Sequence, residues 1–133
     1  MDLKAGMARM KTKTIILFEQ YEGVRFVMER SLRKYEDQIV VQPVRSLGQA
    51  RQLFDVQDVD LLVTEISQIN GEGMGISRFA RAHEPELKIL WVTVAGCDTF
   101  SAEKRHLGVY KCMEKPLGIE EFRRTIAEAL EMV

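Results

Sequence analysis

Cysteine is scarce in this sequence, which has only two among its 133 residues. Cys97 and Cys112 have neither a CxxC interval nor the spacing of a zinc site, so no metal-binding motif is indicated. The basic N-terminus is not followed by an apolar stretch and does not match a secretion signal. We therefore expect both cysteines to be reduced thiols in a cytoplasmic protein. A redox pair is the alternative, because both lie near the ends of neighbouring predicted strands.

The chain also lacks an excess of charge of either sign. It has 19 lysine and arginine residues against 20 aspartate and glutamate residues, a net charge of −1. This balance gives no support for nucleic acid or a membrane surface as a partner. No apolar run approaches the length that crosses a bilayer. A chain of this size that is 46% hydrophobic and 29% charged is typical of one soluble globular domain.

What the sequence does contain is a regular alternation of strand and helix patterns. Short apolar, β-branched runs predict strands at Thr14–Phe18, Gln38–Val44, Asp60–Ile66, Lys88–Val94 and Val109–Glu114. Apolar residues at helical spacing follow each run, within residues 24–35, 46–54, 76–83, 99–108 and 119–133. The alternation predicts an α/β fold, a doubly wound five-stranded parallel sheet with helices on both faces. Pro43 indicates that the second strand lies at an edge of the sheet.

Two further segments bear on the domain organisation. We interpret residues 1–13 as a flexible N-terminal extension and residues 14–133 as one domain. The glycine-rich stretch Asn70–Gly75 has the sequence NGEGMG. It lacks the GxGxxG and GxxxxGK[ST] forms of phosphate-binding loops, so we expect a simple loop with Gly73 as a turn residue.

Polar residues follow four of the predicted strands. Glu19 and Gln20 come after the first strand, Glu65 ends the third, Thr93 ends the fourth and Lys115 follows the fifth. In parallel α/β sheets, the functional crevice lies beyond the carboxyl ends of the strands. Carboxylates there can hold Mg²⁺, while an ammonium and a hydroxyl can bind phosphate oxygens. The sequence therefore predicts a phosphoryl-binding site at this edge.

With Gly73 eight positions after Glu65 and Pro116 directly after Lys115, this set resembles the receiver domain of two-component response regulators. The resemblance covers residues 14–133. It implies a flavodoxin-like (βα)5 fold with strand order 2-1-3-4-5 and a signalling role in a phosphorelay. It also implies a cis peptide between Lys115 and Pro116, since cis bonds belong essentially to proline.

The resemblance assigns a role to each residue of the predicted site. Glu19 and Gln20 fall on the metal-binding acidic pair, and Glu65 falls on the phospho-accepting aspartate. Thr93 and Lys115 fall on the groups that contact the phosphoryl group. Thr93 and Cys112 fall on the two positions that switch between signalling states.

The departures from the family pattern lie in the same site. Glu65 replaces the acceptor aspartate, Gln20 is neutral where an acid is usual, and Cys112 replaces the switching aromatic. The longer Glu65 side chain moves its carboxylate by about 1.5 Å, and a misplacement of about 1 Å can cost on the order of a hundredfold in rate. We expect Mg²⁺ binding to be weak or absent and no other cofactor to be bound. The longer Glu65 side chain also moves its oxygens toward the place of a phosphoryl group, where they could meet Lys115 and Thr93. Whether Glu65 reaches these two residues is the question that the sequence raises.

The sequence therefore favours a pseudo-receiver, a non-enzymatic module that binds a protein partner through the fourth helix, fifth strand and fifth helix. We expect a monomer or a weak homodimer. One alternative is a functional receiver phosphorylated on Glu65 with Mg²⁺. Another is a flavodoxin-like cofactor-binding protein, although the acids in the loop Glu19–Gly23 would oppose a bound phosphate. The sequence leaves open the partner, the pathway and whether Glu65 gives an always-on or an always-off state.

Overall fold

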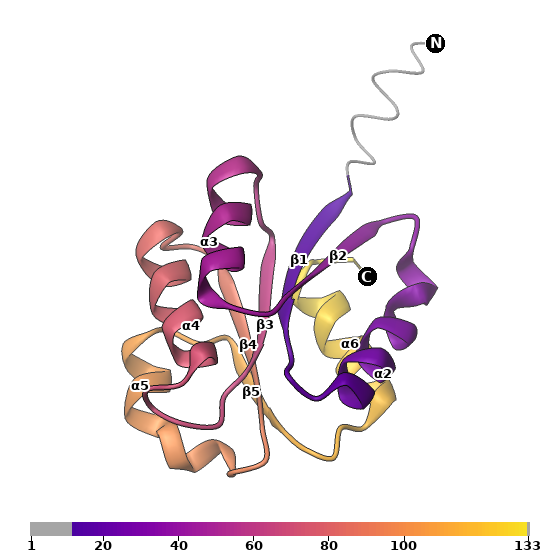
Figure 1. Cartoon of the computed structure of the whole chain (residues 1–133). Helices are drawn as coiled ribbons and strands as arrows, with labels where there is room; N and C mark the ends of the chain where they lie inside the picture. The colour runs from indigo at the N-terminus through magenta and orange to yellow at the C-terminus, as the bar shows by residue number, and fades with distance from the viewer. Residues whose placement is uncertain (1–11, 133) are drawn as a thin grey trace.

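The computed structural model describes residues 12–132, which form five parallel strands and the helices between them (Figure 1). The strands are β1 (Lys13–Phe18), β2 (Ile39–Val44), β3 (Leu61–Glu65), β4 (Lys88–Thr93) and β5 (Lys111–Glu114). The helices are α2 (Glu22–Ser31), α3 (Leu47–Val56), α4 (Glu72–His83), α5 (Ser101–His106) and α6 (Ile119–Ala129), with 3-10 helices η1 (Leu32–Tyr35) and η2 (Cys97–Phe100). The sheet order is β2-β1-β3-β4-β5. The flavodoxin-like (βα)5 prediction is therefore confirmed.

Alternate residues of β1 supply two separate cores. Ile15 and Leu17 pack in a buried cluster with residues of α2 and α6, whereas Ile16 and Phe18 pack with residues of α3 and α4. Figure 1 shows α2 and α6 on one side of the sheet and α3, α4 and α5 on the other. Because successive side chains of a strand point to opposite faces, a strand between two helical layers must be apolar at every position.

Local sequence signals place the first elements around the site. Pro43 lies in β2, an edge strand, as predicted. The hydroxyl of Ser46 accepts a hydrogen bond from the backbone N–H of Gln49 at 3.1 Å and caps α3. The Gln49 side chain accepts a hydrogen bond from the backbone N–H of Arg45 at 2.7 Å. In a capping box this bond would come from the N–H of the capping residue itself, Ser46, one position later.

The glycine-rich stretch differs from the prediction of a simple loop. α4 begins at Glu72, so Gly73 lies in the first turn of a helix. A Cβ built on Gly73 would overlap the carbonyl oxygen of Glu65. The absence of a side chain at Gly73 thus allows α4 to pack directly on the end of β3. From the sequence alone, a glycine needed for this close packing cannot be distinguished from a glycine in a turn.

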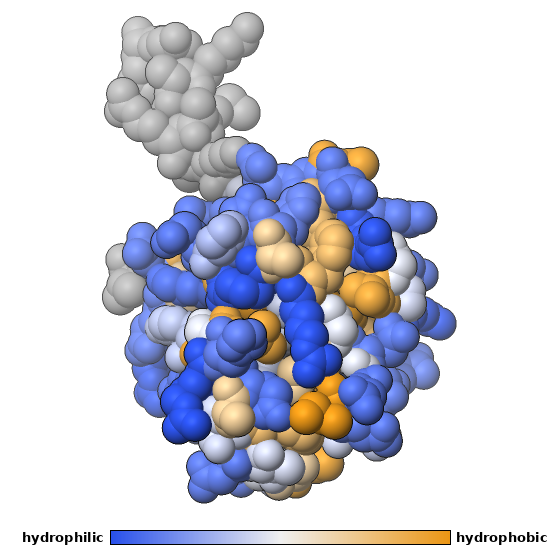
Figure 2. Space-filling view, turned by 90° about the vertical axis from the view of Figure 1, so that its left-hand side faces the viewer, coloured by the Kyte–Doolittle hydropathy of each residue, from blue (hydrophilic) through white to orange (hydrophobic). Residues whose placement is uncertain are grey.

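The predicted N-terminal extension falls almost wholly outside the described residues. Lys13, its last expected residue, already belongs to β1. Within residues 12–132, no helix is both long and apolar enough to span a membrane. The side of the molecule shown in Figure 2 is mostly hydrophilic, with hydrophobic residues in small separate areas.

Candidate functional site

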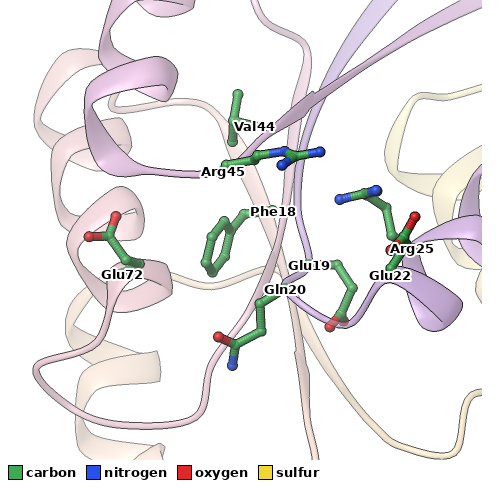
Figure 3. Close-up of a pocket in the computed structure, with 8 residues that line it drawn as sticks. All are labelled: Phe18, Glu19, Gln20, Glu22, Arg25, Val44, Arg45 and Glu72. Carbon is green, nitrogen blue, oxygen red and sulfur yellow. The ribbon is translucent and has the colours of Figure 1, made fainter.

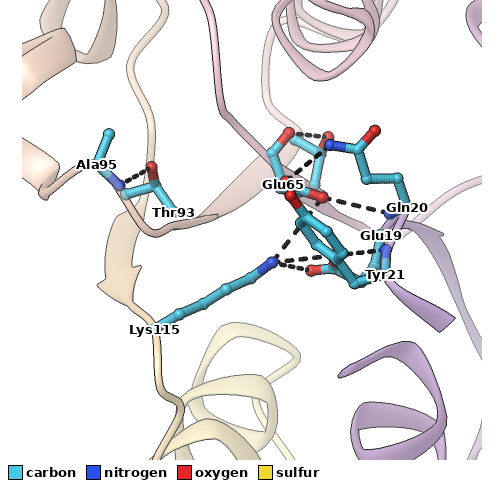
Figure 4. Close-up of polar contacts among 8 residues, drawn as sticks. Glu19, Gln20, Tyr21, Glu65, Thr93, Ala95 and Lys115 are labelled. Atoms are coloured by element: carbon cyan, nitrogen blue, oxygen red, sulfur yellow. Dashed lines mark hydrogen bonds and ion pairs between the residues drawn. The ribbon is translucent and has the colours of Figure 1, made fainter. Parts of the chain in front are cut away.

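The side chains predicted to form the site lie at the carboxyl edge of the sheet. Glu65 is the last residue of β3 and pairs in register with Val92 of β4. Glu19 directly follows β1, and Lys115 directly follows β5. The peptide bond between Lys115 and Pro116 is cis, the isomer that the family resemblance implied. The sheet order places β1 and β3 side by side at the centre, so these carboxylates approach each other (Figure 4).

The main partner of Lys115 is Glu19. The Lys115 Nζ lies 2.8 Å from Glu19 Oε1 and donates a hydrogen bond to Oε2 at 3.0 Å. The Glu19 side chain is fully buried and that of Lys115 is 7% exposed. Tyr21 donates its backbone N–H to Glu19 Oε2 at 3.1 Å, and its ring centroid lies 4.8 Å from the Lys115 ammonium. Tyr21 therefore covers the ion pair, a role that no sequence signal predicted.

Glu65 is held mainly by Gln20. Its Oε2 accepts the backbone N–H of Gln20 at 3.2 Å, and its Oε1 accepts the side-chain amide at 3.1 Å. The Lys115 Nζ is 3.9 Å from Glu65 Oε2, an ion pair that is longer than the one with Glu19. Glu65 is 3% exposed, so its carboxylate is buried at the end of β3. Gln20 thus acts as a donor to Glu65.

Thr93 does not join this cluster. Its hydroxyl accepts the backbone N–H of Ala95 at 3.1 Å, and Figure 4 shows this pair apart from the two carboxylates. Within residues 12–132, no hydrogen bond connects Thr93 to Glu65. The question of whether Glu65 reaches Thr93 is thus answered for the described residues: Glu65 contacts Gln20, and Thr93 contacts Ala95. The reason is that the Gln20 amide directs the Glu65 carboxylate toward β1.

Burial in this cluster raises the pKa of Glu19 to about 7 from an ordinary 4.5. Desolvation by burial is the largest cause, and a hydrogen bond with Glu65 raises the pKa further. The hydrogen bonds from Lys115 and from the Tyr21 backbone act in the opposite direction. Glu19 Oε1 has no partner in hydrogen-bonding geometry, despite its distance of 2.8 Å from the ammonium. Glu19 therefore gains or loses its proton near neutral pH.

These residues do not fit Mg²⁺. Magnesium requires octahedral oxygen ligands and is usually held by one or two carboxylates plus waters. Glu19 is paired with an ammonium, and Glu65 accepts two hydrogen bonds from Gln20. Within the described part of the chain, no three His, Cys, Asp or Glu side chains are grouped to hold a metal ion.

A hollow of about 290 Å³ adjoins the site (Figure 3). It is lined by Phe18, Glu19, Gln20, Glu22, Arg25, Val44, Arg45 and Glu72. Arg25 and Arg45 extend across it (Figure 3), while Glu72 accepts the N–H of Leu47 at 2.6 Å. The wall thus mixes two arginines with three glutamates, which does not favour a polyanionic ligand.

A chain of hydrogen bonds connects the sheet core with the turn that packs on Glu65. The indole N–H of Trp91 donates to the hydroxyl of Ser77 at 3.0 Å, and that hydroxyl donates to the Gly73 carbonyl at 2.8 Å. Ser77 is fully buried. Its sequence signal is a single polar residue within the apolar stripe of the helix, and the sequence alone does not connect it to Trp91.

Cys97 and Cys112 form a disulfide, so the prediction of reduced thiols is wrong for this structure. Cys112 pairs in register with Trp91, and the chain turns after β4 through Gly96, whose φ is 88°. This return places the two Cα atoms 5.8 Å apart, within the range that a disulfide spans. The expected switch position Cys112 is therefore bonded to the loop after β4.

Comparisons with known proteins agree with this geometry. The sequence model of the response regulator receiver domain matches residues 15–127. The response regulator protein PilR of Pseudomonas aeruginosa is 19% identical over 92% of the chain, which spans only 27% of that protein's length.

Solved structures also resemble this fold. A CheY-like response regulator receiver domain protein from Methanospirillum hungatei has a TM-score of 0.78 and 18% identity, with 91% of this chain and 95% of that one covered. The non-phosphorylated HemR receiver domain from Leptospira biflexa has a TM-score of 0.74 and 22% identity, with 92% and 97% covered. At these identities the likeness shows the fold alone. The match over most of the chain, on a sheet of this order, shows that the chain belongs to the response regulator receiver domain family.

Proposed function

We propose that this receiver domain is a degenerate signalling module that binds a protein partner without a phosphorylation cycle of its own. The observation that carries the proposal is the engagement of both carboxylates: Glu19 with Lys115 at 2.8 Å, and Glu65 with Gln20 through two hydrogen bonds. An acceptor carboxylate must attack phosphorus in line while a metal neutralises the transferred group. Here the ammonium takes the place of the cation, and the acceptor position faces an amide.

The energetic cost of reversing this arrangement also supports the proposal. To accept a phosphoryl group, Glu65 would have to leave the Gln20 donors and turn toward Lys115 and Thr93. Lys115 would have to leave Glu19, and a Glu19 that is ionised would then be a buried charge without its cation. Leaving an ionised partner unpaired in this way costs about 3–5 kcal/mol. Phosphorylation would have to overcome this cost before any chemistry.

The competing function is a receiver phosphorylated on Glu65, and one experiment separates the two. The protein is incubated with Mg²⁺ and a small-molecule phosphodonor, and its intact mass is recorded over time. We expect no phosphate adduct on the wild-type chain. A stoichiometric adduct that is lost in Glu65→Ala would overturn the proposal.

A gain-of-function variant makes the negative result informative. Gln20→Asp with Glu65→Asp supplies an acid pair and an acceptor of the shorter length, and we expect this variant to form the adduct. Gln20→Asp alone is the matched control, since it adds the charge but keeps the long acceptor. If neither variant reacts, the block lies outside these two positions and the assignment of Glu65 as the degenerate acceptor fails.

The flavodoxin-like cofactor binder is the less favoured function. The hollow beside β1 carries three glutamates in addition to its arginines, and the loop Glu19–Gly23 presents acids where a phosphate would approach. A colourless purified protein is the expected result, and bound flavin absorbance would revive this alternative.

For the partner surface we propose the face of α5, β5 and α6, the fourth helix, fifth strand and fifth helix of the sequence analysis. β5 is an edge strand, and Lys111 on it lies 3.8 Å from Glu121 of α6 in an exposed ion pair. Tyr110, directly before β5, is 40% exposed, and Val94, directly after β4, is 64% exposed. Exposed aromatic residues are enriched at protein-binding surfaces, which have polar rims. We further propose that the partner is cytoplasmic and that the domain is a monomer or a weak homodimer.

A photo-crosslinking amino acid at Tyr110 tests this surface in cells. The matched control places it at Phe26, which is 55% exposed on α2. We expect a specific crosslinked band from position 110 and none from position 26. The reverse pattern would move the partner surface to α2.

A further inference from the structure

The Cys97–Cys112 disulfide encloses a small substructure of the fold. Cys97 is the first residue of η2, and Cys112 lies in β5. The bond joins positions 15 residues apart. The segment that it closes contains η2 and the whole of α5.

Apart from the disulfide, this enclosed segment is held mainly through the residues that flank α5. None of the residues of α5 is buried. Phe100 before the helix and Leu107 after it are 8% and 7% exposed and pack in the core. Arg81 fixes the far end through a 2.7 Å hydrogen bond to the Leu107 carbonyl. The disulfide is therefore the strongest attachment at the start of the segment.

The bond is also within reach of a reagent. Cys97 and Cys112 are both partly exposed, and Asp98 and Thr99 beside them are exposed. The N–H of Cys97 lies 3.3 Å from the carboxylate of Glu114, which accepts its hydrogen bond. A site of this kind differs from a disulfide sealed inside a core, because a thiolate can approach a sulfur without global unfolding.

We propose that Cys97 and Cys112 form a redox site that a dithiol reductant opens and glutathione disulfide closes. One thiolate of the reductant attacks a cysteine sulfur, breaks the S–S bond and forms a mixed disulfide with the departure of the other cysteine as a thiolate. The second thiolate of the reductant then displaces the attached cysteine. The cysteines gain two electrons and two protons, and the reductant becomes a disulfide.

Opening the bond affects the segment that follows β4. The hydroxyl of Thr99 donates to the Ala95 carbonyl at 2.7 Å, and the Ala95 N–H donates to the Thr93 hydroxyl. Release of Cys97 loosens this chain of contacts at one end, so α5 and the loop after Thr93 become mobile together. The redox state thus sets the conformation of α5. This inference does not depend on the proposed lack of phosphorylation.

Thiol labelling and hydrogen exchange on the full chain test the proposal. Before reduction, the native protein should take no iodoacetamide; after dithiothreitol without denaturant, it should take two groups per chain. Amide exchange in residues 97–108 should then become at least about tenfold faster, with β1 and β3 unchanged. Glutathione disulfide should restore both the protection and the resistance to labelling.

Cys97→Ser with Cys112→Ser is the matched control. It should exchange like the reduced wild type and should not respond to dithiothreitol. The proposal is overturned if the untreated protein already takes label, if the bond opens only in denaturant, or if the reduced protein keeps the exchange pattern of the oxidised one. Because the last comparison uses the wild-type chain, it stands even if the double variant does not fold.

Discussion

The stability of the domain should fall as pH rises, and Glu19→Gln should remove most of this dependence. Burial and the neighbouring Glu65 raise the pKa of Glu19 to about 7 in the folded protein, above its ordinary 4.5. A carboxyl group whose pKa is raised on folding binds its proton more tightly in the folded state. Its contribution to stability is therefore complete below about pH 4.5 and is lost as pH rises through about 7.

The magnitude follows from the same shift. One pKa unit corresponds to about 1.4 kcal/mol, and the window from pH 5 to pH 8 covers nearly the whole difference between the two pKa values. The free energy of unfolding should therefore decrease by on the order of 2–3 kcal/mol across this window because of Glu19. Glu19→Gln keeps the size of the side chain but cannot ionise. The variant should become more stable relative to wild type by that amount between pH 5 and pH 8.

Urea denaturation followed by the fluorescence of Trp91, the one tryptophan of the sequence, measures this difference at each pH. Other groups titrate in both proteins, so the comparison of wild type with variant isolates Glu19. Glu22→Gln is the matched control: Glu22 is exposed in the first turn of α2, and its variant should follow the wild-type curve. Parallel curves for wild type and Glu19→Gln would refute the reasoning about the buried cluster.

Substitutions at three other places in the molecule, namely the start of α4, the Ser77–Trp91 hydrogen bond and the disulfide, have defined outcomes. Gly73→Ala should lower the free energy of unfolding, measured by urea denaturation, by roughly 2–4 kcal/mol, because the new Cβ would overlap the Glu65 carbonyl. Gly75→Ala is the control, since its Cβ would meet only Leu47 at 3.7 Å. This variant should have an unchanged free energy of unfolding or one that is higher by up to about 1 kcal/mol. Ser77→Ala leaves the Trp91 indole N–H without its acceptor. The variant should lose about 1–3 kcal/mol of unfolding free energy, and its fluorescence emission maximum should shift. An unchanged emission spectrum would exclude the Trp91–Ser77 hydrogen bond. Cys97→Ser with Cys112→Ser should lower the free energy of unfolding by about 3 kcal/mol relative to the oxidised protein; equal denaturation midpoints would contradict this.

The sequence predicted the fold because each strand carries its own signal. Ile15, Ile16 and Leu17 are apolar without alternation, which only a strand covered on both faces requires. Pro43 marked the edge, and Ser46 marked a helix start. These signals depend on residues that are close together in the chain, so they can be recognised without knowledge of the tertiary contacts.

The features that the sequence did not predict depend on distances between elements. Periodicity does not show that the first turn of α4 must approach the Glu65 carbonyl closely enough to exclude a side chain at Gly73. The sequence spacing does not show that the turn at Gly96, which has a positive φ, brings Cys97 beside Cys112. The sequence also does not predict the orientation of Glu65. Whether its carboxylate contacts Gln20 or Thr93 depends on side-chain rotamers at the carboxyl edge of the sheet.

If the site is degenerate as proposed, Glu19 and Lys115 stay paired and the site does not accept a phosphoryl group. Fluorine NMR with beryllofluoride, a phosphoryl analogue, tests this proposal without dependence on the rate of any phosphodonor. In the presence of Mg²⁺, we expect no protein-bound fluoride signal for the wild-type chain and a bound signal for Gln20→Asp with Glu65→Asp. A bound signal on the wild-type chain that disappears in Glu65→Ala would show that Glu65 is a working acceptor.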